Sequence, residues 1–244
     1  MSPQQDSAGA PAPSDSAGVP GVSGLLARLA ARASASGLEV RGAFHPAPAE
    51  IRELPPGGTV ILLGFTGGLQ WNTFERSAEA GDGRPDPLDR WSERVVGALA
   101  RDFDAEAFYP NGSPRLPFQR LARRAEPVHQ SPLGLLIHPR FGLWHAYRGA
   151  LWLRTRIALP AAARSAAPCE SCTPRPCLAG CPVNAFRGGT LDVEACVRHV
   201  RSRAGIECRE HGCQARRACP EGSAYRYTDA QARFHMEAFL RAMG

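Results

Sequence analysis

The feature that most constrains this chain is a set of eight cysteines, all of them between Cys169 and Cys219. The first 168 residues hold no cysteine, so the thiols form one local group. Their spacing divides them into two sets, and each set ends in a Cys-Pro pair, at Pro182 and at Pro220. The two sets are Cys169, Cys172, Cys177 and Cys181, and Cys196, Cys208, Cys213 and Cys219.

Eight clustered cysteines can form a disulfide framework, a pair of zinc sites or a pair of iron-sulfur clusters. Disulfides need an oxidising compartment. Residues 1–24 have neither a basic region nor an apolar stretch typical of a secretory signal, so we expect a cytoplasmic protein with reduced thiols. No run of the chain is apolar over the roughly 18 residues that a membrane helix needs. A metal site is therefore the favoured interpretation.

The spacing favours clusters over zinc. Structural zinc sites pair two C-x2-C knuckles, whereas bacterial ferredoxins use C-x2-C-x2-C-x3-C-P and give the fourth cysteine to the other cluster. The first set here is C-x2-C-x4-C-x3-C-P, which is the ferredoxin pattern with two added residues in "TPRP". Two structural zinc ions remain the alternative, and the widened loop is their best support.

The ferredoxin rule assigns the ligands of two 4Fe-4S clusters. The first cluster takes Cys169, Cys172, Cys177 and Cys219. The second cluster takes Cys181, Cys196, Cys208 and Cys213.

The charge of the chain changes once clusters are counted. The formal net charge is +6, but an oxidised 4Fe-4S cluster with four thiolates carries about −2, so two clusters lower the total to about +2. Nucleic acid is therefore not an expected partner. The arginines near the cysteines are expected instead to offset cluster charge: Arg198, Arg201, Arg203, Arg209, Arg216 and Arg217. The chain has no lysine, which excludes Schiff-base chemistry and a P-loop.

The cysteine-free part predicts an α+β fold. A helix should begin near Ser23 and end at Gly37, and a second should have Asp86 as its cap and Pro87 at its first position. Strands are expected at residues 59–65, and near 105–110, 133–139, 141–147 and 150–157. Strand alternation would place His145, Tyr147 and Gly149 on one face, which suits either a ligand or a half-exposed strand with packed aromatics.

The segment "IHPRFGLWHAYRGAL", residues 137–151, resembles the signature of the cobalamin type C trafficking family, the cyanocobalamin reductases and alkylcobalamin dealkylases. Looser similarity covers most of residues 37–157 and the tail "YRYTDAQARFHMEAF". The resemblance implies a nitroreductase-like domain that binds cobalamin. The residues it implies at the corrinoid are His138, Pro139, Arg140, Phe141, Gly142, Trp144, Tyr147 and Arg148.

The cysteine region, with "LDVEACVRHV" between its two sets, is similar instead to the tail of epoxyqueuosine reductases and reductive dehalogenases. These place two 4Fe-4S clusters beside a corrinoid. The two resemblances together imply a small two-cluster, ferredoxin-like C-terminal module on a corrinoid-binding domain. The expected organisation is a disordered tail at 1–21, the α+β domain at 22–160, the cluster module at 165–224 and a helix at 225–244 packed on the first domain.

The function implied is an oxidoreductase that passes electrons from the clusters to cobalt and so removes the upper ligand of a corrinoid. A low-potential donor of ferredoxin or flavodoxin type would supply the electrons. Two alternatives stay open: a dicluster electron carrier without a corrinoid, and an epoxyqueuosine reductase-like enzyme acting on tRNA. No serine, histidine and aspartate arrangement supports hydrolase chemistry, and no catalytic residue is assigned.

Overall fold

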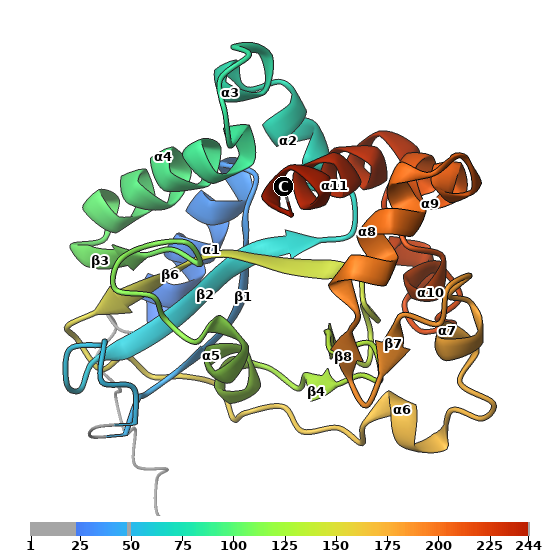
Figure 1. The fold of residues 1–244 in the computed structure, drawn as a ribbon. Coiled ribbons are helices and arrows are strands. Elements are labelled where there is room, and N and C mark those ends of the chain that lie inside the picture. Colours follow the sequence, from blue (N-terminus) through green and yellow to red (C-terminus); the bar gives the residue numbers. More distant parts are fainter. Residues whose placement is uncertain (1–22, 48–49, 244) are drawn as a thin grey trace, which may run out of the picture.

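The computed structural model describes residues 23–47 and 50–243, and its centre is a four-stranded antiparallel sheet (Figure 1). The strand order is β1 (Glu39–Phe44), β2 (Thr59–Thr66), β6 (His145–Leu153) and β3 (Ala105–Phe108). Helices and strands are mixed along the chain, so the α+β fold class is confirmed. The tail expected at residues 1–21 lies outside the described residues.

Successive side chains of β2 point to opposite faces of the sheet, and a hydrophobic cluster lies on each face. Every residue of this strand is buried. Ile61 and Leu63 face a cluster that includes side chains of helices α1 (Ser23–Ala35) and α4 (Pro87–Asp102). Val60 and Leu62 face a second cluster, which includes side chains of helix α5 (Phe118–Ala125). The predicted strand at 59–65 is thus confirmed as the central element of the sheet.

Helix α4 begins where the sequence predicts, with Asp86 as its N-cap and Pro87 as its first residue. The Asp86 side chain makes no capping hydrogen bond, contrary to the prediction. Asp86 adopts a left-handed conformation, with φ of 50°, and its backbone carbonyl accepts the first helical bonds from Asp89 and Arg90. Helix α1 ends at Ala35, just before Gly37, which has a positive φ.

The predictions for residues 133–157 need correction. The two strands expected at 141–147 and 150–157 are one strand, β6, because Gly149 continues the pairing with β2. The strand expected at 133–139 shrinks to β5 (Leu136–Ile137), paired with β4 (His129–Gln130). A bulge also leaves Arg148 without a partner in β2. It turns Gly149 toward Val96 of α4, so the predicted common face of His145, Tyr147 and Gly149 is wrong for Gly149.

The chain after the sheet forms short elements at one end of the molecule, drawn in orange and red in Figure 1. Earlier in the chain, two short helices follow β2: α2 (Trp71–Glu75) and α3 (Ala78–Gly81). The cysteine region holds α6 (Pro168–Ser171), α7 (Pro176–Ala179), β7 (Phe186–Arg187), β8 (Thr190–Leu191), α8 (Val193–Arg201), η1 (Arg203–Gly205), α9 (Ile206–His211), α10 (Gln214–Arg217) and η2 (Ser223–Tyr225). The final helix is α11 (Asp229–Ala242), capped by the Thr228 side chain.

Helix α11 joins the two parts of the molecule. It lies against α9 of the cysteine region. Its Phe234 also packs edge-on against Trp71 and Phe74 of α2, with ring centroids 5.1 and 5.4 Å away. These contacts attach the end of the chain to the core of the sheet. None of the helices in the described ranges combines the length and the apolar character that crossing a membrane requires.

Candidate metal centres and adjoining cavities

The first group of thiols comes from three segments of the chain. Cys169 lies in α6 and Cys177 in α7, while Cys172 follows α6 and Cys219 follows α10. Burial raises the pKa of Cys169, and the charges of Cys219, Cys177 and Cys172 raise it further. The structure therefore makes Cys219 an electrostatic neighbour of three cysteines that lie more than 40 residues earlier in the chain. These four are the residues that the sequence assigns to the first cluster.

The second group gathers in the same way. Cys196 lies in α8 and Cys208 in α9, while Cys181 follows α7 and Cys213 precedes α10. Burial raises the pKa of Cys196 to about 11, with added contributions from Cys213, Cys181 and Cys208. Burial, together with Cys208 and Cys181, also raises the pKa of Cys213. Cys181 is thus an electrostatic neighbour of Cys196 and Cys213, and its assignment to the second cluster stays a prediction.

All eight thiols are free, and no disulfide joins them. Across residues 23–47 and 50–243, no three His, Cys, Asp or Glu side chains converge closely enough for a single metal ion. Tetrahedral zinc, with Zn–S near 2.3 Å, would hold its ligand sulfurs about 3.8 Å apart. A four-iron cluster lies between its ligands and keeps their sulfurs further apart. Thiolate sulfurs are ligands for both kinds of centre.

Local sequence explains how the short elements hold the thiols in place. Asp192 caps α8 by accepting the backbone N–H of Ala195 at 2.9 Å, which fixes the turn on which Cys196 lies. The backbone N–H of Ala185 lies 3.3 Å from Cys181 Sγ. The residues added in "TPRP" form the turn between α6 and α7, in which Arg175 has a φ of 60° and is the N-cap of α7. The widened loop thus starts the helix that carries Cys177.

A cavity of about 470 Å³ opens beside the second group of thiols, and we call it the cluster-side cavity. Cys196 and Cys213 are part of its wall. The rest of the wall is mostly apolar and includes Leu135, Met236 and Phe239. Arg216 is its one charged lining residue.

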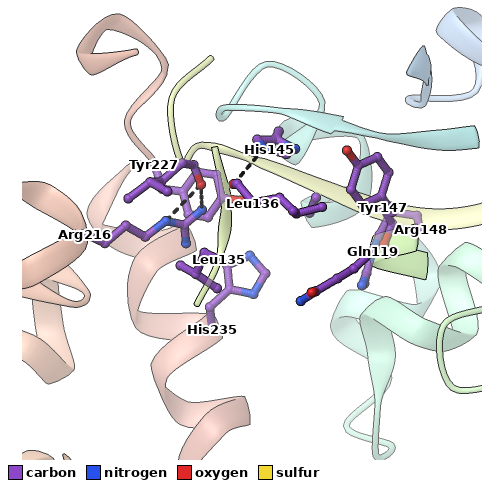
Figure 2. A pocket seen from close by; sticks show the side chains of 11 residues that line it. Gln119, Leu135, Leu136, His145, Tyr147, Arg148, Arg216, Tyr227 and His235 are labelled. Carbon is purple, nitrogen blue, oxygen red and sulfur yellow. Dashed lines mark hydrogen bonds between the residues drawn. The ribbon is translucent and has the colours of Figure 1, made fainter. Parts of the chain in front are cut away.

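A second cavity, of about 360 Å³, lies between β6 and the end of the chain, and we call it the sheet-side cavity (Figure 2). Leu135 and Arg216 line both cavities, so the two share a wall. Polar and aromatic side chains dominate the sheet-side lining: Gln119, His145, Tyr147, Arg148, Arg216, Tyr227 and His235. The bulge in β6 allows the consecutive residues Tyr147 and Arg148 to line the same space.

Two histidines of the sheet-side cavity are held neutral. Burial, reinforced by Arg41, lowers the pKa of His145 to about 3, and burial with Arg216 lowers that of His235 to about 3. The Nε2–H of His145 donates to the Leu136 carbonyl at 3.1 Å, which leaves Nδ1 as an acceptor without a partner among the described residues (Figure 2). His235 Nε2 also lacks a partner there. The cavity therefore presents buried hydrogen-bonding atoms that a polar ligand could satisfy.

The eight residues predicted at the corrinoid do not share one cavity. Tyr147 and Arg148 line the sheet-side cavity. Trp144 packs against Arg216, and its ring centroid lies 4.5 Å from the guanidinium carbon. His138, Arg140 and Phe141 instead line a third cavity, of about 500 Å³, near β1. Pro139 is half-buried in the turn beside them. The backbone of Gly142 lies against Glu221, where the loop meets the segment after the last Cys-Pro pair.

Sequence reasoning did not identify the buried network behind β6. The hydroxyl of Tyr147 donates to Glu126 Oε1 at 2.5 Å, and Arg41 Nη2 donates to Glu126 Oε2 at 2.9 Å. Burial raises the pKa of Glu126, while Arg41 and the Tyr147 hydroxyl oppose that rise. Arg41 also contacts Thr66, which donates to Glu39. The network fixes the position of Tyr147, but its members are far apart in sequence and follow no motif.

A distant likeness is found among solved structures. Among solved structures, the chain is similar to epoxyqueuosine reductase from Streptococcus thermophilus, with 16% sequence identity and a TM-score of 0.42. The match covers 70% of this chain and spans half the length of that protein. No family model matches the chain, and no curated protein does. A likeness of this degree carries no argument, so the proposals below rest on the residues of this chain.

Proposed function

We propose that this protein is an iron-sulfur oxidoreductase in which two 4Fe-4S clusters supply electrons for reductive removal of the upper ligand of a corrinoid. One observation carries the proposal. Eight free thiols form two groups of four, and one group borders a cavity that shares its wall with a second, polar and aromatic cavity. This arrangement puts a redox-active ligand set next to a space for a substrate.

The thiol chemistry fits the clusters. Cys169, Cys172, Cys177 and Cys219 would hold one cluster, and Cys181, Cys196, Cys208 and Cys213 the other. When bound, each cluster supplies one electron at a time, at a potential set by hydrogen bonds and nearby charge. The backbone N–H of Ala185 and the Gln214 side-chain amide, which lie 3.3 and 3.6 Å from Cys181 and Cys208 sulfurs, would tune that potential.

The lining of the sheet-side cavity fits the edge of a corrinoid, which is rich in carboxamides. His145 Nδ1 can accept a carboxamide N–H, because burial keeps the ring neutral. Arg148 Nη1 lies 3.3 Å from Asp89 Oδ1, and this contact orients the guanidinium, which could donate to a carboxamide oxygen. The cavity volume, about 360 Å³, accommodates only part of a corrinoid, so the remainder would extend into the cluster-side cavity or solvent.

The absence of a predicted acid-base catalyst is consistent with this chemistry. A corrinoid carries the bond-breaking step itself, and the protein contributes binding, orientation and redox tuning. The roles of these side chains are accordingly to hold an edge of the ligand and to exclude water from the space between the cavities. The Glu126 carboxylate would hold the Tyr147 side chain in place while the ligand is bound.

The experiment that tests the proposal follows the cobalamin spectrum. The protein is reconstituted anaerobically with iron and sulfide, mixed with cyanocobalamin or hydroxocobalamin, and given a strong low-potential reductant. We expect about eight irons per chain, a spectrum of cobalamin with its lower base displaced, and faster cyanide loss than without protein. Arg148→Gln should weaken cobalamin binding and leave the iron content unchanged. Eight irons with an unchanged cobalamin spectrum would overturn the corrinoid part of the proposal.

Two other functions are distinguished by the same preparation. A dicluster electron carrier would bind its clusters and exchange electrons with a ferredoxin or flavodoxin type partner, but would leave the cobalamin spectrum unchanged. An enzyme acting on a modified tRNA nucleoside, as the name of the solved neighbour suggests for that protein, would bind tRNA with an affinity that falls steeply with salt.

A further inference from the structure

Arg216 occupies the wall between the two cavities. It lies on α10, between Cys213 and Cys219 in the sequence. Its guanidinium carbon is 4.5 Å from the ring centroids of both Trp144 and Tyr227. Its Nε and Nη2 donate to the Leu143 carbonyl at 3.1 and 2.5 Å. Five donors are available on a guanidinium, so contacts with two rings and one carbonyl hold it in place and leave donors unused.

Arg216 differs from Arg198, Arg209 and Arg217 in having no carboxylate partner among the described residues. Arg217, the next residue, pairs with Glu207 at 2.5 Å. Arg198 and Arg209, two other arginines near the cysteines, also lie beside carboxylates. Arg216 is half-buried and makes no ion pair with any carboxylate in the part of the chain that the structure describes. A half-buried cation without an ion pair is stabilised by negative charge that is brought close to it.

Thiols that would become negatively charged on binding a cluster line the same cavity as Arg216. Arg216 lines the cluster-side cavity together with Cys196 and Cys213. These two belong to the second group of four, and no cysteine of the first group lines this cavity. We propose that Arg216 is the counter-ion of the cluster held by Cys181, Cys196, Cys208 and Cys213, and that it raises the reduction potential of this cluster, the one that faces the cavities.

The sign of the effect follows from charge alone. An oxidised 4Fe-4S cluster with four thiolates carries about −2, and accepting one electron makes it about −3. A nearby cation stabilises the more negative state more strongly, and therefore favours reduction. The first cluster, whose thiols do not border these cavities, should be less sensitive to Arg216. Arg216 also lines the sheet-side cavity, so the same charge lies between the cluster and the space for the substrate.

The inference rests on the proposed clusters, and its test uses the full chain after anaerobic loading with iron and sulfide. Redox titration followed by electron paramagnetic resonance gives the potential of each cluster. In Arg216→Gln, we expect one potential to become more negative and the other to stay unchanged. Arg217→Gln, the matched control, should shift neither. The shifting signal should be the one that is missing in Cys181→Ala, which lacks a ligand of the second cluster.

Further variants separate charge from packing. Arg216→Lys keeps the positive charge and should keep the wild-type potential more closely than Arg216→Gln does. Arg216→Met retains an apolar stem between the two rings but should shift the potential as Arg216→Gln does. If both neutral variants lose only the irons of the second cluster while Arg217→Gln keeps all of them, the counter-ion role is also supported.

Two results would overturn the inference while leaving the proposed function intact. If Arg216→Gln left the potential of each cluster at its wild-type value, Arg216 would not act on either cluster. Equal shifts of both clusters would show a general charge effect instead of a specific one. A wild-type protein that binds no iron after reconstitution would instead contradict the proposed function itself.

Discussion

The sheet and the cysteine region are stabilised in different ways. The sheet buries two apolar clusters, one on each face, built from long side chains such as Leu63, Trp91 and Trp152. The buried core of the cysteine region consists in large part of cysteines, with Cys177, Cys181 and Cys219 among its members. Its helices are also short, and three of them have only four residues.

The difference indicates which part can fold without a cofactor. Apolar burial of about 25 cal/mol per Å² stabilises the sheet whatever the metal content. Helices of four residues are not stable by themselves. A metal that binds only the folded form would therefore contribute folding free energy directly to the cysteine region. We expect the two regions to respond in opposite ways to metal removal and to core substitution.

The largest expected effect is that of removing iron. Chelation under anaerobic, reducing conditions should abolish hydrogen-exchange protection in residues 168–225 and leave protection in β2 and β6. The physical reason is that the metal-free core of this region is a set of protonated thiols with raised pKa values, as for Cys169 and Cys196. Equal protection of the region before and after iron removal would contradict the comparison.

The next effect concerns one cysteine. Cys181→Ala should reduce iron from about eight to about four per chain, because it removes a ligand of the second cluster only. Cys177→Ala, the third cysteine of the first group, is the matched variant and should remove the other four. Iron analysis and electron paramagnetic resonance identify which cluster remains in each variant. If Cys181→Ala and Cys177→Ala removed the same signal, the crossed assignment would be wrong.

A substitution in the core of the sheet should lower stability and leave the iron content unchanged. Leu63→Ala leaves a cavity beside α4 and should lower the free energy of unfolding by about 2 to 5 kcal/mol. Iron content should stay at the wild-type value, because no thiol contacts this side of the sheet. Denaturant unfolding of the two proteins measures the difference. A loss of iron at native conditions would show that the two regions do not fold separately.

A smaller effect is expected where the two regions meet. Gly142 has a φ of 57°, and a Cβ there would lie 1.9 Å from the carbonyl oxygen of Glu221. Gly142→Ala should cost more than about 1 kcal/mol from its left-handed conformation alone, and the clash adds to this. Gly57→Ala, also at positive φ but with open space around it, is the control for conformation. Equal losses in the two variants would show that the backbone contact contributes nothing.

The last effect is a dependence on pH, which is small over any single pH unit. Burial lowers the pKa of His138 to about 4, and those of His145 and His235 to about 3. The unfolded chain binds these protons near pH 6.5, so stability is full above that pH and falls as the pH drops toward 3 to 4. Each histidine contributes at most about 1.4 kcal/mol per pH unit. His235→Phe should flatten the measured slope, and an unchanged slope would refute its buried neutral state.

The sequence predicted the elements whose signals are local. The β2 run of apolar residues, Pro87 at the start of α4 and the glycine after α1 each specify a structure within a few residues. The assignment of Cys181 to the same cluster as Cys196 comes from the ferredoxin pattern and stays a prediction. The sequence could not predict the bulge at Arg148, because a single strand does not reveal how its partner pairs. Arg216, Tyr227 and His235 come to the sheet-side cavity from the far end of the chain, and no local pattern marks them.

The most direct test of the account is a count of iron, acid-labile sulfide and zinc in protein purified and reconstituted without oxygen. The account predicts about eight irons and about eight sulfides per chain, with two electron paramagnetic resonance signals after reduction. About two zinc ions per chain, with no sulfide and no signal, would contradict the assignment of the eight cysteines to iron-sulfur clusters.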